Sequence, residues 1–333
     1  MSSRGLGLLV SLFLVFMVVV ASCASPAPSQ KAEKIVIGYS AVTGSQGLPF
    51  VMKDAGIFEK YGLEPDLQLV QGGALATKAL IAGNIQIAQV AGPAVVEAYA
   101  NGADVAIIAG IVSVLEHKLL VKNNIDKPSD LKGKRIAVLQ VGDITETAAK
   151  YYIKGFGLEP GKDVAIVAVG GPAERIAAVE AGAADATILI EPFVTRAKAK
   201  GLKEMASPST IEYQATTFTT TKSFIKSKPD VVKRFVKAVV DGIHFYKTHK
   251  EASMKSLASF LKLQDDMPAV EATWKGYTET MADLPYPTVK GVQTIMDEMV
   301  SSNEKAKNMK PEDVVDMSFV KELDTSGFVK GLK

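Results

Sequence analysis

The feature that most constrains the fold is an internal repeat, in which residues 35–93 resemble residues 135–192 at a nearly constant offset. Gly-Leu-Glu-Pro occurs at residues 62–65 and again at 157–160, and a glycine pair occurs at 72–73 and again at 170–171. Each copy opens on a short apolar run and later contains Ala-x-x-Ala-Gly. Short apolar runs that end in small or polar turns are typical of buried parallel strands. The repeat therefore predicts two similar α/β lobes with a cleft between them.

The rest of the chain is divided around these two units. We expect lobe one to cover residues 35–117, lobe two to cover 118–215, and residues 216–333 to return to lobe one. The two crossings are expected near residues 114–121 and in the Thr-rich stretch 216–221. From residue 229 onward, apolar residues recur at helical spacing, as in 231–245. This C-terminal part is predicted to be helical and to pack mostly on lobe one.

The N-terminus has the features of an export sequence. Arg4 precedes an apolar run at residues 5–20, which is short for a membrane span of about 20 residues. Val-Ala-Ser-Cys follows and resembles the bacterial lipobox, in which the cysteine becomes the lipid-modified mature N-terminus. We expect residues 1–22 to be a signal peptide, Cys23 to be lipidated, and the Pro- and Ser-rich residues 23–34 to form a tether. The alternative is a stray cysteine near an ordinary cleavage site.

Composition excludes several classes of function. Cys23 is the single cysteine, so the chain has no internal disulfide, no thiol nucleophile beyond it and no cysteine metal site. Lys and Arg number 38 against 36 Asp and Glu, which gives no argument for a nucleic-acid partner. His244 and His249 are spaced so that they cannot share one helix face, and no cofactor or metal is predicted.

Ligands of open α/β sheets bind beyond the carboxyl ends of the strands. This rule selects six loops, at residues 40–46, 71–74, 89–93, 140–145, 170–174 and 191–193. Several of these loops open helices, whose free N–H groups and partial positive charge favour anions. Glycines there let a ligand approach the backbone closely, although tight strand–helix turns also need glycine. The candidate ligand-binding residues are Ser40, Thr43, Ser45, Gln46, Gly72, Gly73, Ala91, Gly92, Gly142, Asp143, Thr145, Gly170, Gly171 and Glu191.

Four side chains could be functional or merely structural. Asp143 and Glu191 would repel a bare anion and accept hydrogen bonds from an amine, amide or hydroxyl, but Asp143 is also placed to cap a helix. Arg175 could reach an acidic ligand, yet its position favours a surface residue. His117, on the first crossing, is expected to be a structural histidine with its hydrogen bonds satisfied. We expect the acid end of a solute near Ser40, Thr43, Ser45 and Gly92, and its donor end near Glu191.

Together these motifs resemble the substrate-binding proteins of ABC importers, in the subgroup for aliphatic sulfonates, nitrate, taurine and thiamine pyrimidines. The resemblance is carried by the lipobox, Ile-Gly-Tyr-Ser at 37–40, Ser-Asp-Leu-Lys-Gly-Lys-Arg-Ile at 129–136 and Ala-Gly-Ala-Ala-Asp-Ala at 181–186 before Glu-Pro at 191–192. It covers nearly all of residues 34–330 and implies a type II periplasmic-binding-protein fold, with two α/β lobes joined by a two-strand hinge that encloses the ligand on closure.

The function that the resemblance implies is capture of a small, acid-bearing organic solute in the cleft and its delivery to an ABC permease with its ATPase. The protein is then a monomer, not an enzyme, held by lipid on Cys23 in the periplasm or at the cell surface. Two alternatives stay open. One is an enzyme on the same fold, such as those of pyrimidine or menaquinone pathways; the thiamine-pyrimidine synthases carry a cysteine-rich motif that this chain lacks. The other is a lipid-anchored sensor subunit.

Overall fold

The computed structural model describes residues 32–207, 211–300 and 303–332. The expected signal peptide, Cys23 and nearly all of the expected tether lie outside the described residues. Among the helices of the described ranges, none is both long and apolar enough to cross a membrane.

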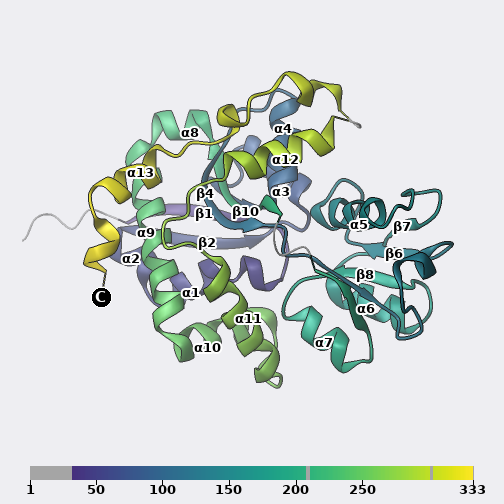
Figure 1. Cartoon of the computed structure of the whole chain (residues 1–333). Helices are drawn as coiled ribbons and strands as arrows, with labels where there is room; N and C mark the ends of the chain where they lie inside the picture. Colours follow the sequence, from purple (N-terminus) through teal and green to yellow (C-terminus); the bar gives the residue numbers. More distant parts are fainter. Residues whose placement is uncertain (1–31, 208–210, 301–302, 333) are drawn as a thin grey trace, which may run out of the picture. The chain divides into compact units, whose positions relative to one another are not determined.

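Lobe one is built on a five-stranded sheet with the order β2-β1-β3-β10-β4 (Figure 1). β1 pairs in parallel with both β2 and β3, whereas β10 runs antiparallel to β3 and β4. The strands are β1 (Glu33–Tyr39), β2 (Leu63–Leu69), β3 (Ile87–Val90), β4 (Val105–Val114) and β10 (Glu212–Thr221).

Lobe two repeats this arrangement in a second sheet, with the order β7-β6-β8-β5-β9. β6 pairs in parallel with β7 and β8, and β5 runs antiparallel to β8 and β9. The strands are β5 (Lys118–Val121), β6 (Arg135–Val138), β7 (Ala165–Ala168), β8 (Ala186–Leu189) and β9 (Lys203–Ala206). The two α/β lobes predicted from the repeat are therefore confirmed, and their sheets share one pattern of strand order.

The crossings between the lobes are short. The first lies between Val114, which ends β4, and Lys118, which begins β5; the second lies between β9 and β10. At residues 216–221 we expected a strand that returns the chain to lobe one. This stretch is part of β10 and pairs inside the lobe-one sheet, so the crossing itself lies before it. The hydroxyl of Thr217 donates to the carbonyl of Val90, so a Thr-rich strand can be buried within a sheet.

Helices flank both sheets and begin where the parallel strands end. In lobe one, Gly56 adopts φ 67° and separates the helix at residues 48–54 from the helix at 57–60. The helices of the two α/β units are α1 (Leu48–Asp54), α2 (Ile57–Lys60), α3 (Gly73–Ile81), α4 (Gly92–Ala100), α5 (Ile144–Gly155), α6 (Pro172–Glu180) and α7 (Phe193–Ala199).

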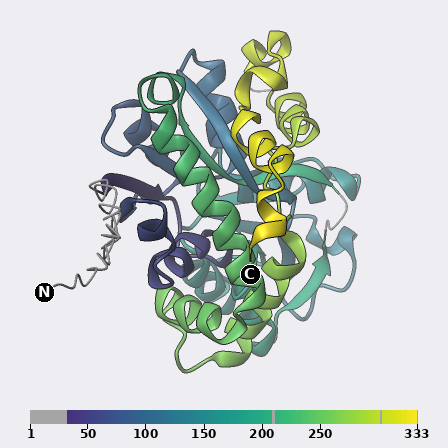
Figure 2. The same ribbon diagram turned by 90° about the vertical axis from the view of Figure 1, so that its left-hand side faces the viewer.

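The C-terminal part is helical, as predicted. Its helices at residues 222–227, 229–248 and 318–325 lie on the side of lobe one away from lobe two (Figure 1 and Figure 2). Phe235 of α9 packs against Phe58 and Phe218, with ring centroids 6.3 and 5.1 Å apart, in the main core. α11 also contacts α7, so this part reaches lobe two as well. Its helices are α8 (Lys222–Ser227), α9 (Pro229–Thr248), α10 (Lys250–Leu261), α11 (Met267–Thr280), α12 (Val289–Met299) and α13 (Ser318–Thr325).

Candidate functional site

A cavity of about 310 Å³ lies where the carboxyl ends of the two sets of parallel strands face each other. Its walls come from the loops after β1, β2 and β3 in lobe one and after β6, β7 and β8 in lobe two. The six loops selected from the sequence therefore surround one space. The volume suits a small organic molecule, at the lower end of the usual range for ligand pockets.

Most of the residues selected from the sequence line this cavity. Gly72, Gly92, Gly170 and Glu191 are the exceptions and stand just behind its wall. Gly72 caps α3 and its N–H donates to the Ser40 carbonyl, whereas Gly92 packs so closely on β10 that a Cβ would lie 2.3 Å from the Gln214 carbonyl oxygen. The lining residues are Ser40, Thr43, Ser45, Gln46, Gly73, Ala91, Gly142, Asp143, Thr145 and Gly171.

The lobe-one wall contains hydroxyl and amide side chains but no charged side chain among the described lining residues. The hydroxyls of Thr43 and Ser45 are 3.2 Å apart and share one hydrogen bond, and both residues line the cavity. The side-chain oxygen of Gln46 accepts from the Ser40 backbone N–H, so its amide nitrogen is the end left for a ligand. These side chains are buried although they are polar, which is expected where a solute completes their hydrogen bonding.

Three helices begin on the cavity without a side-chain cap in the described structure: α3, α4 and α6. Each is nine residues long and presents backbone N–H groups and the positive end of its dipole. Together they favour an acidic group in the cavity, as expected from the sequence.

Asp143 caps α5 and also lines the cavity, so it can act both as a helix cap and as a ligand-binding residue. Its Oδ1 accepts from the backbone N–H groups of Thr145 and Glu146 and from the Thr145 hydroxyl. The Thr145 hydroxyl also accepts from the Leu139 N–H and so has no donor left for a solute. Burial raises the pKa of Asp143, while these hydrogen bonds and Arg175 oppose the shift.

Arg175 was expected at the surface, and this is wrong: it is 4% exposed and lines the cavity. Its Nη1 donates to the Gly170 carbonyl oxygen at 3.2 Å, which holds the side chain across the first turn of α6. Burial lowers the pKa of the guanidinium to about 10, against the opposing charges of Asp143 and Glu174. Among the described lining residues it is the one charged cation.

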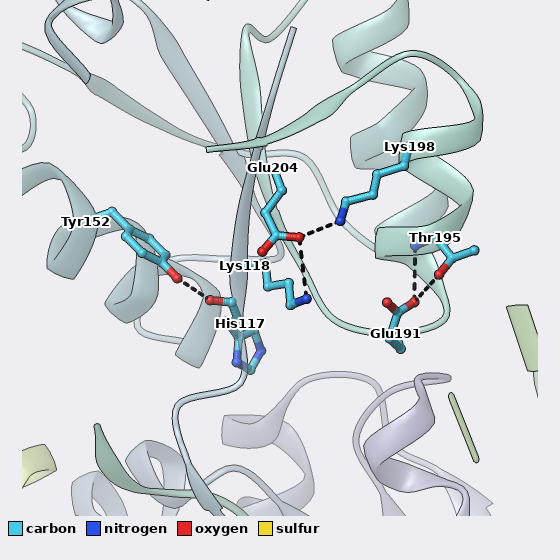
Figure 3. A network of polar contacts seen from close by, with 7 residues as sticks. All are labelled: His117, Lys118, Tyr152, Glu191, Thr195, Lys198 and Glu204. Carbon is cyan, nitrogen blue, oxygen red and sulfur yellow. Dashed lines mark hydrogen bonds and ion pairs between the residues drawn. The ribbon is translucent and has the colours of Figure 1, made fainter. Parts of the chain in front are cut away.

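His117 was expected to be a satisfied structural histidine, and this is also wrong. Its backbone carbonyl accepts from the Tyr152 hydroxyl at 2.7 Å, but within the described residues its buried Nδ1 has no hydrogen-bond partner (Figure 3). The imidazole lines the cavity. Burial and the charge of Arg175 lower its pKa to about 3, so the ring is neutral at physiological pH.

Glu191 is turned toward its own helix. Its carboxylate accepts from the Thr195 N–H at 3.1 Å and the Thr195 hydroxyl at 2.9 Å at the start of α7 (Figure 3). The peptide bond to Pro192 is cis. The cavity wall thus presents Asp143 rather than Glu191 to the donor end of a solute.

The two lobes touch at both sides of the cavity. The Gly44 N–H donates to the Glu191 carbonyl oxygen at 3.3 Å, and a Cβ on Gly44 would lie 2.7 Å from that oxygen. A Cβ on Gly72 would lie 3.0 Å from the side-chain nitrogen of Gln140 in lobe two. Glycine at these two positions therefore lets the lobes approach each other.

The sequence contained a weak sign of the two residues that were missed. Arg175 lies in the first turn of a helix that follows a glycine pair, the same location that selected Gly171. His117 lies in the three-residue crossing. Their burial depends on tertiary packing, which a local pattern does not report.

Several solved binding proteins share this architecture. The chain is similar to the alkanesulfonate-binding protein SsuA from Xanthomonas axonopodis pv. citri, with a TM-score of 0.71, 19% identity and coverage of 87% of this chain and 100% of that one. The nitrate-binding protein NrtA from Synechocystis has a TM-score of 0.75, 16% identity and coverage of 89% of both chains. The fold is that of the periplasmic binding proteins.

The chain belongs to the NMT1/THI5 like family, whose model matches residues 48–253. It is also 27% identical to the taurine-binding periplasmic protein of Escherichia coli K12, over 70% of this chain and 72% of that protein. The resemblance stated from the sequence motifs is therefore confirmed.

Proposed function

We propose that this protein is the extracytoplasmic solute-binding component of an ABC importer, and that it captures a small organic solute with an acidic group. The observation that carries the solute class is the cavity on which α3, α4 and α6 begin without side-chain caps. The taurine-binding, sulfonate-binding and nitrate-binding relatives support the transport role. Its partners are then a permease and an ATPase subunit.

The test is a thermal-shift screen of the purified protein against sulfonates, carboxylates, nitrate, pyrimidines and amino acids. A solute that binds only the folded state raises the melting temperature. At a concentration one hundred times its Kd, it stabilises the folded state by about 2.7 kcal/mol. The expected result is a shift with an acid-bearing organic compound. A screen in which no compound shifts the melting temperature contradicts the proposal.

The solute is bound and released unchanged. Binding proteins among the relatives support this over the enzyme alternative. Mass spectrometry of the solute after long incubation with the protein is expected to recover it intact. Recovery of a product would favour an enzyme, and retained binding with no effect of gene deletion on uptake would favour the sensor alternative.

Attachment to the membrane is proposed through lipid on Cys23, and the protein is proposed to act as a monomer. The basis is the Val-Ala-Ser-Cys pattern and the Pro- and Ser-rich residues after it. A diacylglycerol group supplies the two chains that stable anchoring needs. Cys23→Ser is expected to move the protein from the membrane to the soluble fraction in cells that lack the permease; continued membrane association would contradict lipid anchoring.

A further inference from the structure

The lobe-two side of the cavity contains buried polar atoms that lack partners. In the part of the chain that the structure describes, these are Oδ2 of Asp143, Nε of Arg175 and Nδ1 of His117, all on residues that line the cavity. Native proteins leave few buried polar atoms without hydrogen bonds, because each is costly. A solute in the cavity is well placed to supply the missing partners.

The missing partners are of opposite kinds. Nε of Arg175 carries a hydrogen and can only donate, whereas Oδ2 of an ionised Asp143 can only accept. The occupant must therefore offer an acceptor oxygen and also an N–H or O–H group. Nδ1 of neutral His117 can serve as donor or acceptor according to its tautomer.

The charges on this wall also disfavour a bare anion. Arg175 is opposed by Asp143 and Glu174, whose charges act on it, and both of them line the cavity. An inorganic anion would gain the attraction of Arg175 but would meet repulsion from Asp143, and it has no hydrogen to give to Oδ2. An acid that also carries a donor avoids this conflict.

We propose that this wall selects organic acids that carry an amino or hydroxyl group, and that it discriminates against inorganic anions and plain alkyl acids. This rests on the proposed function, since it assumes that the solute occupies this cavity. Nε of Arg175 donates to an oxygen of the solute, and Oδ2 of Asp143 accepts from the amino or hydroxyl group.

Asp143→Asn tests the proposal, because asparagine also caps helices well and preserves Oδ1 as the acceptor for α5. Asp130→Asn is the matched control: Asp130 also accepts two backbone N–H groups in lobe two, but it does not line the cavity. Calorimetric titrations compare two pairs of acids that differ in the donor group: taurine with ethanesulfonate, and 3-hydroxypropionate with propionate. Nitrate is titrated as the inorganic anion. In the wild type, the donor-bearing member of at least one pair is expected to bind about tenfold to a hundredfold tighter. Asp143→Asn is expected to abolish that preference, whereas Asp130→Asn retains it.

Arg175→Lys is a second variant that retains the positive charge and removes Nε–H. It is expected to weaken both members of a pair about tenfold or more and to leave their ratio unchanged. Four results would each overturn the inference. The first two are equal wild-type affinity for the two members of both pairs, and tighter binding of nitrate than of the organic acids. The other two are an unchanged preference for the donor-bearing acid in Asp143→Asn, and no binding of either donor-bearing acid. If another class of compound still raises the melting temperature in those cases, the proposed function stands. If no compound does, the proposed function fails too.

Discussion

The two lobes share one strand order but differ in what they contribute to the cavity. The lobe-one wall carries hydroxyls and helix N-termini and no charged side chain among the described lining residues, whereas the lobe-two wall carries Asp143, Glu174 and Arg175. Lobe one also carries the C-terminal helices and most of the large buried side chains, while part of lobe two packs around a smaller separate cluster. The two lobes are thus similar frameworks with different loops. In the proposed function, the lobe-one loops favour an acid and the lobe-two loops also require a donor.

The largest effect is expected from a substitution in the core of lobe one, and it tests whether this core provides most of the stability of the molecule. Phe235→Ala removes a fully buried ring that packs on Phe58 and Phe218, and is expected to lower the free energy of unfolding by about 3–5 kcal/mol. Chemical denaturation measures the change. Phe245→Ala, on the same helix, is the control: its ring is partly exposed and stacks on His249, so the loss should be clearly smaller. Equal losses would contradict this account of the core.

The second prediction concerns the crossing between the lobes. Burial and the charge of Glu191 raise the pKa of Glu116 from 4.5 to about 7, against an opposing effect of Tyr277. Between these two values the folded state retains a proton that the unfolded state has released, so the free energy of unfolding falls as the pH rises.

Glu116→Gln is expected to remove this fall. Relative to the variant, the free energy of unfolding of the wild type should fall by about 2–3 kcal/mol between pH 4.5 and 7. Above that range the difference between the two proteins should change little. Urea denaturation across this range measures the difference. Burial also raises the pKa of Glu298, but this group is common to both proteins and cancels in the comparison. Parallel pH profiles would remove Glu116 as the cause.

The third prediction concerns a substitution that should keep the two lobes from closing fully. A Cβ on Gly44 would lie 2.5 Å from Tyr277 Cε2 and 2.7 Å from the Glu191 carbonyl oxygen of the opposite lobe. Gly44→Ala is therefore expected to cost about 1–3 kcal/mol of solute affinity, roughly tenfold to a hundredfold. Small-angle scattering with saturating solute should show a larger radius of gyration than for the wild type. Gly276→Ala on α11 is the control, since a Cβ there meets nothing within 4 Å. An unchanged affinity in Gly44→Ala would show that the lobes can close without this contact.

The smallest effect is expected from the ion pair between the lobes. Arg196 of α7 lies 3.6 Å from Asp266, the N-cap of α11, and both side chains are partly exposed. Arg196→Gln is expected to change solute affinity by about 0.2–1 kcal/mol, and less at high salt. Titrations at low and high ionic strength measure it. A loss beyond tenfold that persists in high salt would show that Arg196 does more than form this pair.

The sequence by itself determined the architecture, because strands and helices follow local patterns. The apolar run that opens each copy of the repeat predicted β1 and β6, and the rule that ligands bind beyond the carboxyl ends of strands predicted the loops of the cavity. The spacing of Asp143 and Glu146 also predicted the cap of α5, because capping depends on residues three positions apart.

The tertiary structure alone decided which side chains face the solute. The Thr-rich stretch 216–221 was expected to be the strand that returns the chain to lobe one, but only the fold pairs it with β3 and β4, which lie far away in the sequence. From the sequence, Arg175 was expected at the surface and His117 in a structural role, but in the fold both line the cavity. Glu191 was expected to bind the ligand, but its carboxylate accepts a hydrogen bond from Thr195 instead. Burial and hydrogen-bond partners are set by contacts between distant segments, and a local pattern carries no record of them.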